Sequence, residues 1–188
     1  MTPASSADSS PAISNYRFTN PSFLTEALTH KSYVNERRDS GRKHNERLEF
    51  LGDAVLSLIM SDYLAGRYPE LSEGALSKLK ATLVSEAPLA NAARRLDLGA
   101  RLKLGRGEEL SNGRGKASLL ADAFEAIIAA IYLDGGLEAS RHFTIEALTE
   151  ELRQIDVLQE KPMDQRASHE FLWHEWTCPG VGREEGLA

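Results

Sequence analysis

Apolar residues recur with the period of an α-helix in every long segment of this chain, and no segment alternates with the period of two that marks a strand. Cap residues and prolines bound these segments. The predicted helices begin at Asn20-Pro21-Ser22, near Asn45 (ending around Tyr68-Pro69), at Ser72-Glu73, after a cap at Ser85, at Ala117 (closed by Asp134-Gly135-Gly136) and at Leu137 (ending near Ile155). We therefore predict an all-α fold.

Two polar stretches connect these helices, residues 35–44 and the Gly-rich residues 105–116. The second ends in Gly115-Lys116 but does not match the phosphate-loop pattern, because Leu110 replaces its first glycine and Ala117 follows the lysine. Such charge-rich connections are either solvated or grip phosphates. The candidate RNA-binding side chains are Arg37, Arg38, Arg42, Lys43, Arg114 and Lys116.

Composition divides the chain into one domain over residues 16–155 and two flanking segments. Residues 1–15 are rich in Ser, Pro and Ala and are expected to be disordered, and residues 156–188 lack helical or strand periodicity and form an irregular tail. The single cysteine, Cys178, excludes a disulfide framework and a Cys-based zinc site. No apolar run reaches the roughly 18–20 residues of a membrane helix, and no secretion signal is recognisable, so a cytoplasmic location is expected.

The net charge of −6 at first argues against a nucleic-acid partner. Residues 16–155, however, hold 19 basic and 20 acidic side chains, whereas residues 156–188 hold 3 and 7. The main domain is therefore close to neutral, and a bound divalent cation would make its acidic region more attractive to a phosphodiester.

Carboxylates gather on the predicted helices at spacings that suit a metal ion. Glu46, Glu49 and Asp53 lie within roughly 60° of one another on a helical wheel, and Asp122 and Glu125 repeat the i, i+3 spacing. Glu73 follows the predicted cap at Ser72. Acids on a helix face are usually just solvated, but both sets lie in strongly apolar helices, where repulsion and desolvation call for a cation or a shared proton. Oxygen ligands favour Mg²⁺ or Mn²⁺ over zinc.

Phe50 falls on the acidic side of its predicted helix, apart from the apolar set Leu48, Leu51, Val55, Leu58 and Ile59. Two interpretations stay open: it contacts another protein surface, or it packs under a neighbouring loop. His44, just before the acids, is interpreted as a positional residue and not as a ligand or base.

The segment from Glu46 to Leu56, Glu-Arg-Leu-Glu-Phe-Leu-Gly-Asp-Ala-Val-Leu, resembles the signature of the ribonuclease III family, which are bacterial double-stranded-RNA endonucleases. The likeness extends through residues 80–85, 119–126 and 131–136 and covers roughly residues 16–155. It implies an all-α endonuclease domain that acts as a homodimer on double-stranded RNA, as in rRNA and mRNA processing, with Mg²⁺ at each centre and Mn²⁺ as a substitute.

Site residues follow from the resemblance position by position. The implied metal ligands are Glu49, Asp53, Asp122 and Glu125. The implied catalytic residues are Asp53, Glu125, Glu46 and Glu73, the last two supporting the site and its water or RNA contacts. Phe50 would insert into a pocket of the partner subunit. The implied reaction is in-line attack of a metal-activated water that leaves a 5′-phosphate and a 3′-hydroxyl.

Family members usually continue into a double-stranded-RNA-binding domain. Leu158-Gln159-Glu160 resembles its opening, but nothing after Lys161 does, so the tail is expected to be truncated or altered in place of that domain. Weak, steeply salt-dependent cleavage would follow, since that domain grips successive minor grooves. Two alternatives remain: an all-α Mg²⁺-dependent nucleoside triphosphate pyrophosphohydrolase, and a non-catalytic duplex-RNA-binding or interaction protein.

Overall fold

The computed structural model describes residues 12–37, 41 and 43–159. In this part of the chain the helices are α1 (Pro21–Ala27), α2 (Lys31–Arg37), α3 (Glu46–Arg67), α4 (Glu73–Leu83), α5 (Glu86–Arg95), α6 (Leu98–Arg101), α7 (Arg106–Leu110), α8 (Ala117–Ala147) and α9 (Thr149–Gln159). A 3-10 turn, η1 (Gly113–Gly115), and two short strands, β1 (Ala12–Ile13) and β2 (Tyr16–Arg17), complete the set. The predicted all-α class is confirmed.

The chain divides into two compact units, residues 1–149 and residues 150–188. The first contains everything from β1 to the end of α8, and α9 forms nearly all of the described part of the second. None of the helices among the described residues is long and apolar enough to cross a membrane.

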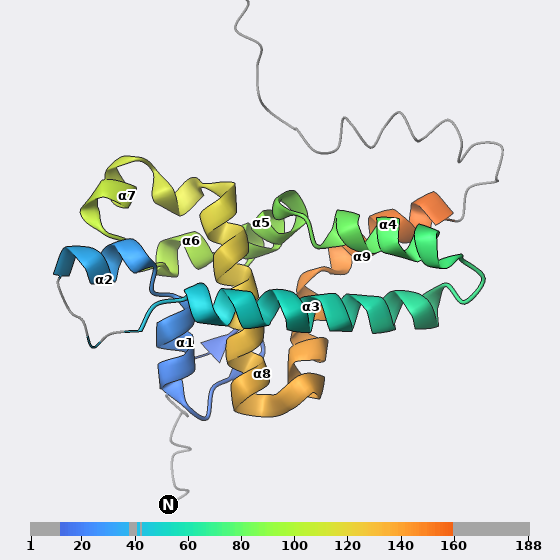
Figure 1. Ribbon diagram of the computed structural model, residues 1–188, viewed down its shortest axis with the longest axis horizontal. Coiled ribbons are helices and arrows are strands. Elements are labelled where there is room, and N and C mark those ends of the chain that lie inside the picture. Colours follow the sequence, from blue (N-terminus) through green and yellow to red (C-terminus); the bar gives the residue numbers. More distant parts are fainter. Residues whose placement is uncertain (1–11, 38–40, 42, 160–188) are drawn as a thin grey trace, which may run out of the picture. The chain divides into compact units, whose positions relative to one another are not determined.

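Helices α3 and α8 form the centre of the first unit, with α3 crossing α8 (Figure 1). Helix α3 buries one apolar face, whereas the first half of α8 is apolar and buried on almost every side. Leu56 and Ile59 of α3, together with Phe124 and Ile127 of α8, are almost fully buried. Each such side chain contributes roughly 1.5–3 kcal/mol on removal from water. This pairing is what holds the acid-bearing segments together.

The predicted caps at Asn20 and Ser72 are confirmed, because each side-chain oxygen accepts a backbone N–H of the first turn, at 3.1 and 3.3 Å. Asn45 and Ser85 hold the capping positions of α3 and α5, but neither side chain caps its helix. Asn45 is instead buried, so its role lies in packing and backbone pairing.

Helices α2 and α7 occupy stretches that were predicted to be loops, which is wrong for residues 35–37 and for most of residues 105–116. The two segments stabilise each other. The Glu36 carboxylate accepts the backbone N–H groups of Arg106 (2.7 Å) and Gly107 (3.1 Å), and the Ser32 hydroxyl accepts that of Gly105 (2.8 Å). These donors lie at the start of α7, where helical N–H groups lack partners. Helix α7 therefore depends on residues about 70 positions earlier.

Residues 12–15 are ordered, which corrects the prediction of disorder for that part of residues 1–15; residues 1–11 lie outside the described residues. Strands β1 and β2 pair antiparallel. The Tyr16 hydroxyl and the backbone N–H groups of Thr19 and Asn20 all donate to the Asp134 carboxylate, each at 2.8 Å. Despite partial burial, these bonds lower the pKa of Asp134, whereas burial and the Asp134 carboxylate raise the pKa of Tyr16 to about 12. Asp134 thus anchors the N-terminal hairpin to α8.

Helix α8 breaks at Gly136, whose φ of 82° and ψ of −178° are not helical. The second half then folds back on the first: the Ser140 hydroxyl donates to the Ile128 carbonyl at 3.1 Å, and the Phe124 and Phe143 rings lie 5.9 Å apart. The predicted end of the apolar helix at residues 134–136 is confirmed. The single helix predicted from Leu137 to Ile155 is wrong, because α8 ends at Ala147 and α9 begins at Thr149.

We expect Asp134→Ala to lower the free energy of unfolding by about 1–3 kcal/mol at pH 7, since three donors lose a charged acceptor. Because the pKa of Asp134 is lowered on folding, this contribution is present above the unfolded pKa of about 3.9 and is lost as the pH falls through the folded value. Urea denaturation at pH 7 and pH 3 measures the difference. The neighbouring Glu138→Ala serves as the exposed control, and an equal loss in both variants would contradict the anchoring role.

Candidate metal centre

Gly52 sits where α3 meets α8, between two of the predicted ligands in sequence. A Cβ atom at this position would lie 1.9 Å from the backbone oxygen of Glu125. No real side chain tolerates that distance, so the two backbones approach as closely as glycine permits. The carboxylates of Glu49 and Asp53 on α3 are thereby held beside those of Asp122 and Glu125 on α8.

These four side chains, Glu49, Asp53, Asp122 and Glu125, are named here the acid cluster. Burial, followed by the charges of Asp53, Asp122 and Glu49, raises the pKa of Glu125 to about 8. Burial is also the main reason that the pKa values of Glu49 and Asp122 are raised. The charges of these acids therefore act on one another, and Glu49, Asp122 and Glu125 do so in partly buried positions where charge is costly, whereas Asp53 is exposed.

Their chemistry fits a divalent metal ion. Four carboxylates supply only oxygen donors, which Mg²⁺ and Mn²⁺ prefer, and a buried carboxyl with a raised pKa is one whose ionised form a cation would stabilise. Within the described residues, however, no three His, Cys, Asp or Glu side chains are arranged to hold one ion. Convergence on one ion stays a prediction.

Glu46 lies at the edge of the acid cluster and is held there by Lys31. The Lys31 ammonium donates to Glu46 Oε1 at 2.7 Å, which lowers the pKa of Glu46. His44 Nδ1 lies 3.7 Å from the other oxygen of this carboxylate, in keeping with a positional role.

Sequence reasoning missed two charged residues beside the cluster. Lys31 lies 15 positions before its partner Glu46, beyond any helical spacing. Glu86 raises the pKa of Asp122, after burial, by its charge. An acid in the first turn of a helix, as Glu86 is in α5, is normally interpreted as a partner of the helix dipole. Neither residue carries a local signal of its position near α8.

Glu73 is not brought to the acid cluster within one chain. It is exposed at the start of α4, where its carboxylate accepts the Ser77 hydroxyl at 2.7 Å. Helix α4 lies along the later turns of α3, as the 3.2 Å bond from Lys80 to Ser61 shows. Glu73 therefore lies apart from the four other acids within one chain, and its catalytic role stays a prediction.

Phe50 points away from the chain, with 82% of its surface exposed. Of the two interpretations of this residue, packing under a neighbouring loop is wrong, and contact with another surface stays a prediction. Leu58, predicted to join the buried face of α3, is 55% exposed. It lies two turns beyond the half-buried Leu51, at the edge of the apolar stripe.

The basic candidates differ in how strongly the fold occupies them. The Arg37 guanidinium lies over the Tyr33 ring, 4.2 Å from its centre, and Lys43 forms a loose 3.6 Å ion pair with Glu26. Arg38 and Arg42 lie outside the described residues.

Arg114 and Lys116 are engaged more fully. Arg114 donates to the carbonyls of Gly99, Ala100 and Leu102 and pairs with Glu109. Lys116 pairs with Glu108 at 2.8 Å. These bonds hold α6, α7 and η1 together, and they leave the two side chains less free to bind phosphate.

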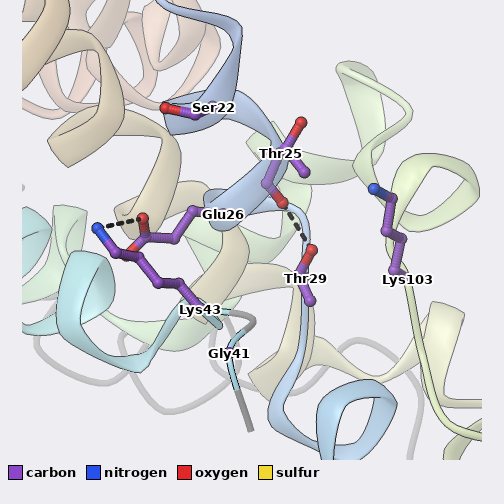
Figure 2. Close-up of a pocket in the computed structure, with 7 residues that line it drawn as sticks. All are labelled: Ser22, Thr25, Glu26, Thr29, Gly41, Lys43 and Lys103. Carbon is purple, nitrogen blue, oxygen red and sulfur yellow. Dashed lines mark hydrogen bonds and ion pairs between the residues drawn. The ribbon is translucent and has the colours of Figure 1, made fainter. Parts of the chain in front are cut away.

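A hollow of about 540 Å³ lies beside α1, lined by Ser22, Thr25, Glu26, Thr29, Gly41, Lys43 and Lys103 (Figure 2). Much of its polar lining is satisfied within the chain: the Thr29 hydroxyl donates to the Thr25 carbonyl at 2.6 Å, and Lys43 pairs with Glu26. We assign no chemistry to it.

Comparison with known families agrees with this arrangement. A family model described as Ribonuclease-III-like matches residues 20–152. Ribonuclease 3 of Desulforamulus reducens is 55% identical over 134 residues, which make up 71% of this chain and 54% of that protein. Ribonuclease 3 of Caldanaerobacter subterraneus is 49% identical over 141 residues, which make up 75% of this chain and 61% of that protein. The chain thus spans little more than half the length of these relatives.

Solved structures give the same result. The nuclease domain of ribonuclease III from Campylobacter jejuni, described for flexibility in a region involved in dimer formation, is 41% identical in sequence. It superposes with a TM-score of 0.67 and covers 72% of this chain and 90% of that one. The family model and the solved structure therefore both confirm the predicted fold.

Gly52→Ala is expected to lower the free energy of unfolding by about 3 kcal/mol or more, because a methyl group would have to push α3 away from the α8 backbone. Gly66→Ala, on the same helix but with no atom within 4 Å of its Cβ position, is the matched control. It should be stabilising by about 0.5–1 kcal/mol through helix propensity. Urea denaturation followed by circular dichroism measures both, and similar values for the two variants would contradict the close contact.

With a chelator present, Glu125→Gln should be stabilising at pH 8.5 and close to neutral at pH 5. The folded pKa of about 8 exceeds the model-peptide value of 4.5, so the folded state holds this proton more tightly and loses stability as the pH rises through 8. Glutamine never ionises and avoids that loss. Because Glu125 keeps some access to water, we expect on the order of 1–2 kcal/mol rather than the full linkage value. Denaturation at both pH values checks this, with Asp62→Asn on α3 as control; a pH-independent difference would overturn it.

Proposed function

This chain belongs to the ribonuclease-III-like family, and from that premise we propose that it is an Mg²⁺-dependent endonuclease of double-stranded RNA. The observation that supports this most directly is the acid cluster at the crossing of α3 and α8, where buried Glu125 is surrounded by three further carboxylates. A cluster of this kind lowers the stability of the protein unless a cation binds to it. A bound cation can also activate water for phosphodiester hydrolysis.

Glu49, Asp53, Asp122 and Glu125 would hold the metal, with Mn²⁺ able to replace Mg²⁺. When bound, the ion would supply positive charge to the phosphodiester and lower the pKa of a water molecule near it. The protein contributes position: the Gly52 contact fixes the distance between the two acid-bearing helices, and partial burial limits the access of water to Glu125.

The catalytic assignments are Asp53, Glu125, Glu46 and Glu73. Asp53 lies on α3 and Glu125 on α8, and the charge of Asp53 contributes to the raised pKa of Glu125, which supports their role. Glu46 borders the cluster and stays ionised through Lys31. Glu73 is assigned by motif alone. Attack of water in line with the leaving group would produce a 5′-phosphate and a 3′-hydroxyl.

A homodimer is part of the proposal. Phe50 directly follows Glu49, and its exposed ring is the kind of side chain that a partner subunit covers. Two such centres would cut the two strands of one duplex. The wider role that goes with this activity is processing of rRNA and mRNA precursors in the cytoplasm.

Phosphate contacts are proposed for the basic side chains that border the domain. Arg37 and Lys43 are exposed, and the contacts they make with described residues, the Tyr33 ring and Glu26, are weak enough to be exchanged for phosphate oxygens. Arg38 and Arg42 are assigned by sequence only. Arg114 and Lys116 are the weaker candidates, since the fold already uses both.

The decisive experiment is cleavage of a long RNA duplex with Mg²⁺ and with chelator, at low and moderate salt, with product sizes measured on a gel. We expect Mg²⁺-dependent products whose yield falls steeply with salt, because the phosphate contacts are mainly electrostatic. Asp53→Asn and Glu125→Gln should lower the rate by about 100-fold or more, since each removes a charge from the site. Asp62→Asn, an acid on the exposed side of α3, should leave it unchanged.

Three outcomes would contradict the proposal. Release of pyrophosphate from mixed nucleoside triphosphates, with intact duplex RNA, would identify a pyrophosphohydrolase. Binding of duplex RNA without cleavage, unchanged by Glu49→Gln, would identify a non-catalytic RNA-binding protein. Full cleavage that salt does not affect would contradict the electrostatic phosphate contacts that the proposal includes.

A further inference from the structure

Lys31 places a cation at the edge of the acid cluster. Its Nζ lies 2.7 Å from Glu46 Oε1, and the two side chains remain about half exposed, at 54% and 46%. An exposed ion pair contributes little to stability. The position of this pair, beside partly buried acids, therefore matters more than its own strength.

The backbone on either side fixes that position. The Asn45 N–H donates to the Thr29 carbonyl at 2.9 Å, which joins the residue just before Glu46 to the residue two before Lys31. The His30 N–H donates to the Lys103 carbonyl at 3.1 Å. Thr29, His30 and Asn45 are all buried. The fold, and not chance contact between two long side chains, brings Lys31 and Glu46 together.

The charge of Lys31 acts beyond Glu46. It opposes the rise in pKa of both Glu49 on α3 and Asp122 on α8. In turn, Glu46, Glu49 and Asp122 raise the pKa of Lys31. An ammonium so placed relieves repulsion among the acids. It also repels any second cation that approaches them, since Coulomb interactions at partly buried sites are only partly screened.

We propose that Lys31 is an internal counter-ion that competes with the divalent metal for the acid cluster and positions Glu46 at its edge. This inference rests on the proposed function, since it assumes that the cluster binds metal. It assigns two opposite effects to one side chain: Lys31 stabilises the protein without metal and weakens metal binding. A residue with a merely structural role would change the stability alone.

The test is the affinity for Mn²⁺ alone, measured without RNA from the electron paramagnetic resonance signal of free Mn²⁺. Lys31→Met should tighten Mn²⁺ binding on the order of 3- to 10-fold, because a like charge is removed a short distance from the ion. Its melting temperature in chelator should fall. Lys31→Arg, which keeps the charge, should restore both values toward those of the wild type.

Lys43→Met is the matched control, because Lys43 also pairs with a glutamate, Glu26 (Figure 2), and is not among the groups whose charge shifts the pKa of Glu49 or Asp122. Its Mn²⁺ affinity should equal that of the wild type. If Lys31→Met does not fold, Lys31→Gln removes the charge and keeps a hydrogen-bond donor, and the same tightening is expected.

Unchanged or weaker Mn²⁺ binding in a folded, uncharged Lys31 variant would overturn the inference while leaving the proposed function intact. Absence of Mn²⁺ binding in the wild type as well would overturn both.

Discussion

The near-contact of two backbones, at Gly52 of α3 and Glu125 of α8, sets the geometry on which the rest of this molecule depends. It fixes how far apart two helices lie whose apolar faces form the core and whose polar edges carry the acids. Core and candidate site are therefore built from the same crossing. Because close-packed interiors transmit small displacements, a change of packing at this point would be felt directly in the spacing of the carboxylates.

Carboxylates on a helix as apolar as α8 lower the stability of the protein, because they are partly removed from water and repel one another. Asp122 and Glu125 alternate with Ala121, Ala123 and Phe124, all of them buried, so neither acid can swing freely into water. The raised pKa of Glu125 reflects this restraint. Lys31 offsets part of the resulting repulsion from outside the two central helices, through a pair that the α2 and α3 termini hold in register.

Local sequence patterns predicted what depends on neighbouring residues: the long helices, the caps at Asn20 and Ser72, the break before Gly136 and the outward direction of Phe50. They failed where a distant residue supplies the partner. Helices α2 and α7 were missed because Glu36 and Ser32 satisfy the start of α7 from about 70 residues away. Lys31 and Glu86 were missed for the same reason, and Leu58 because a wheel does not show where a buried stripe ends. The family signature gave the acids of α3 and α8 as one ligand set, which stays a prediction, and it gave no sign that Glu73 lies apart from them.

The break in α8 at Gly136 depends on the chirality of amino acids. The angles at Gly136, φ 82° and ψ −178°, are the mirror image of an extended conformation that L-amino acids adopt readily. Open space surrounds the position, so no neighbouring atom forbids a larger residue; the backbone alone does. A D-alanine introduced by chemical synthesis would find its preferred conformation there, whereas L-alanine would not. Glycine is the one achiral amino acid that the ribosome incorporates, and it is the residue found at position 136.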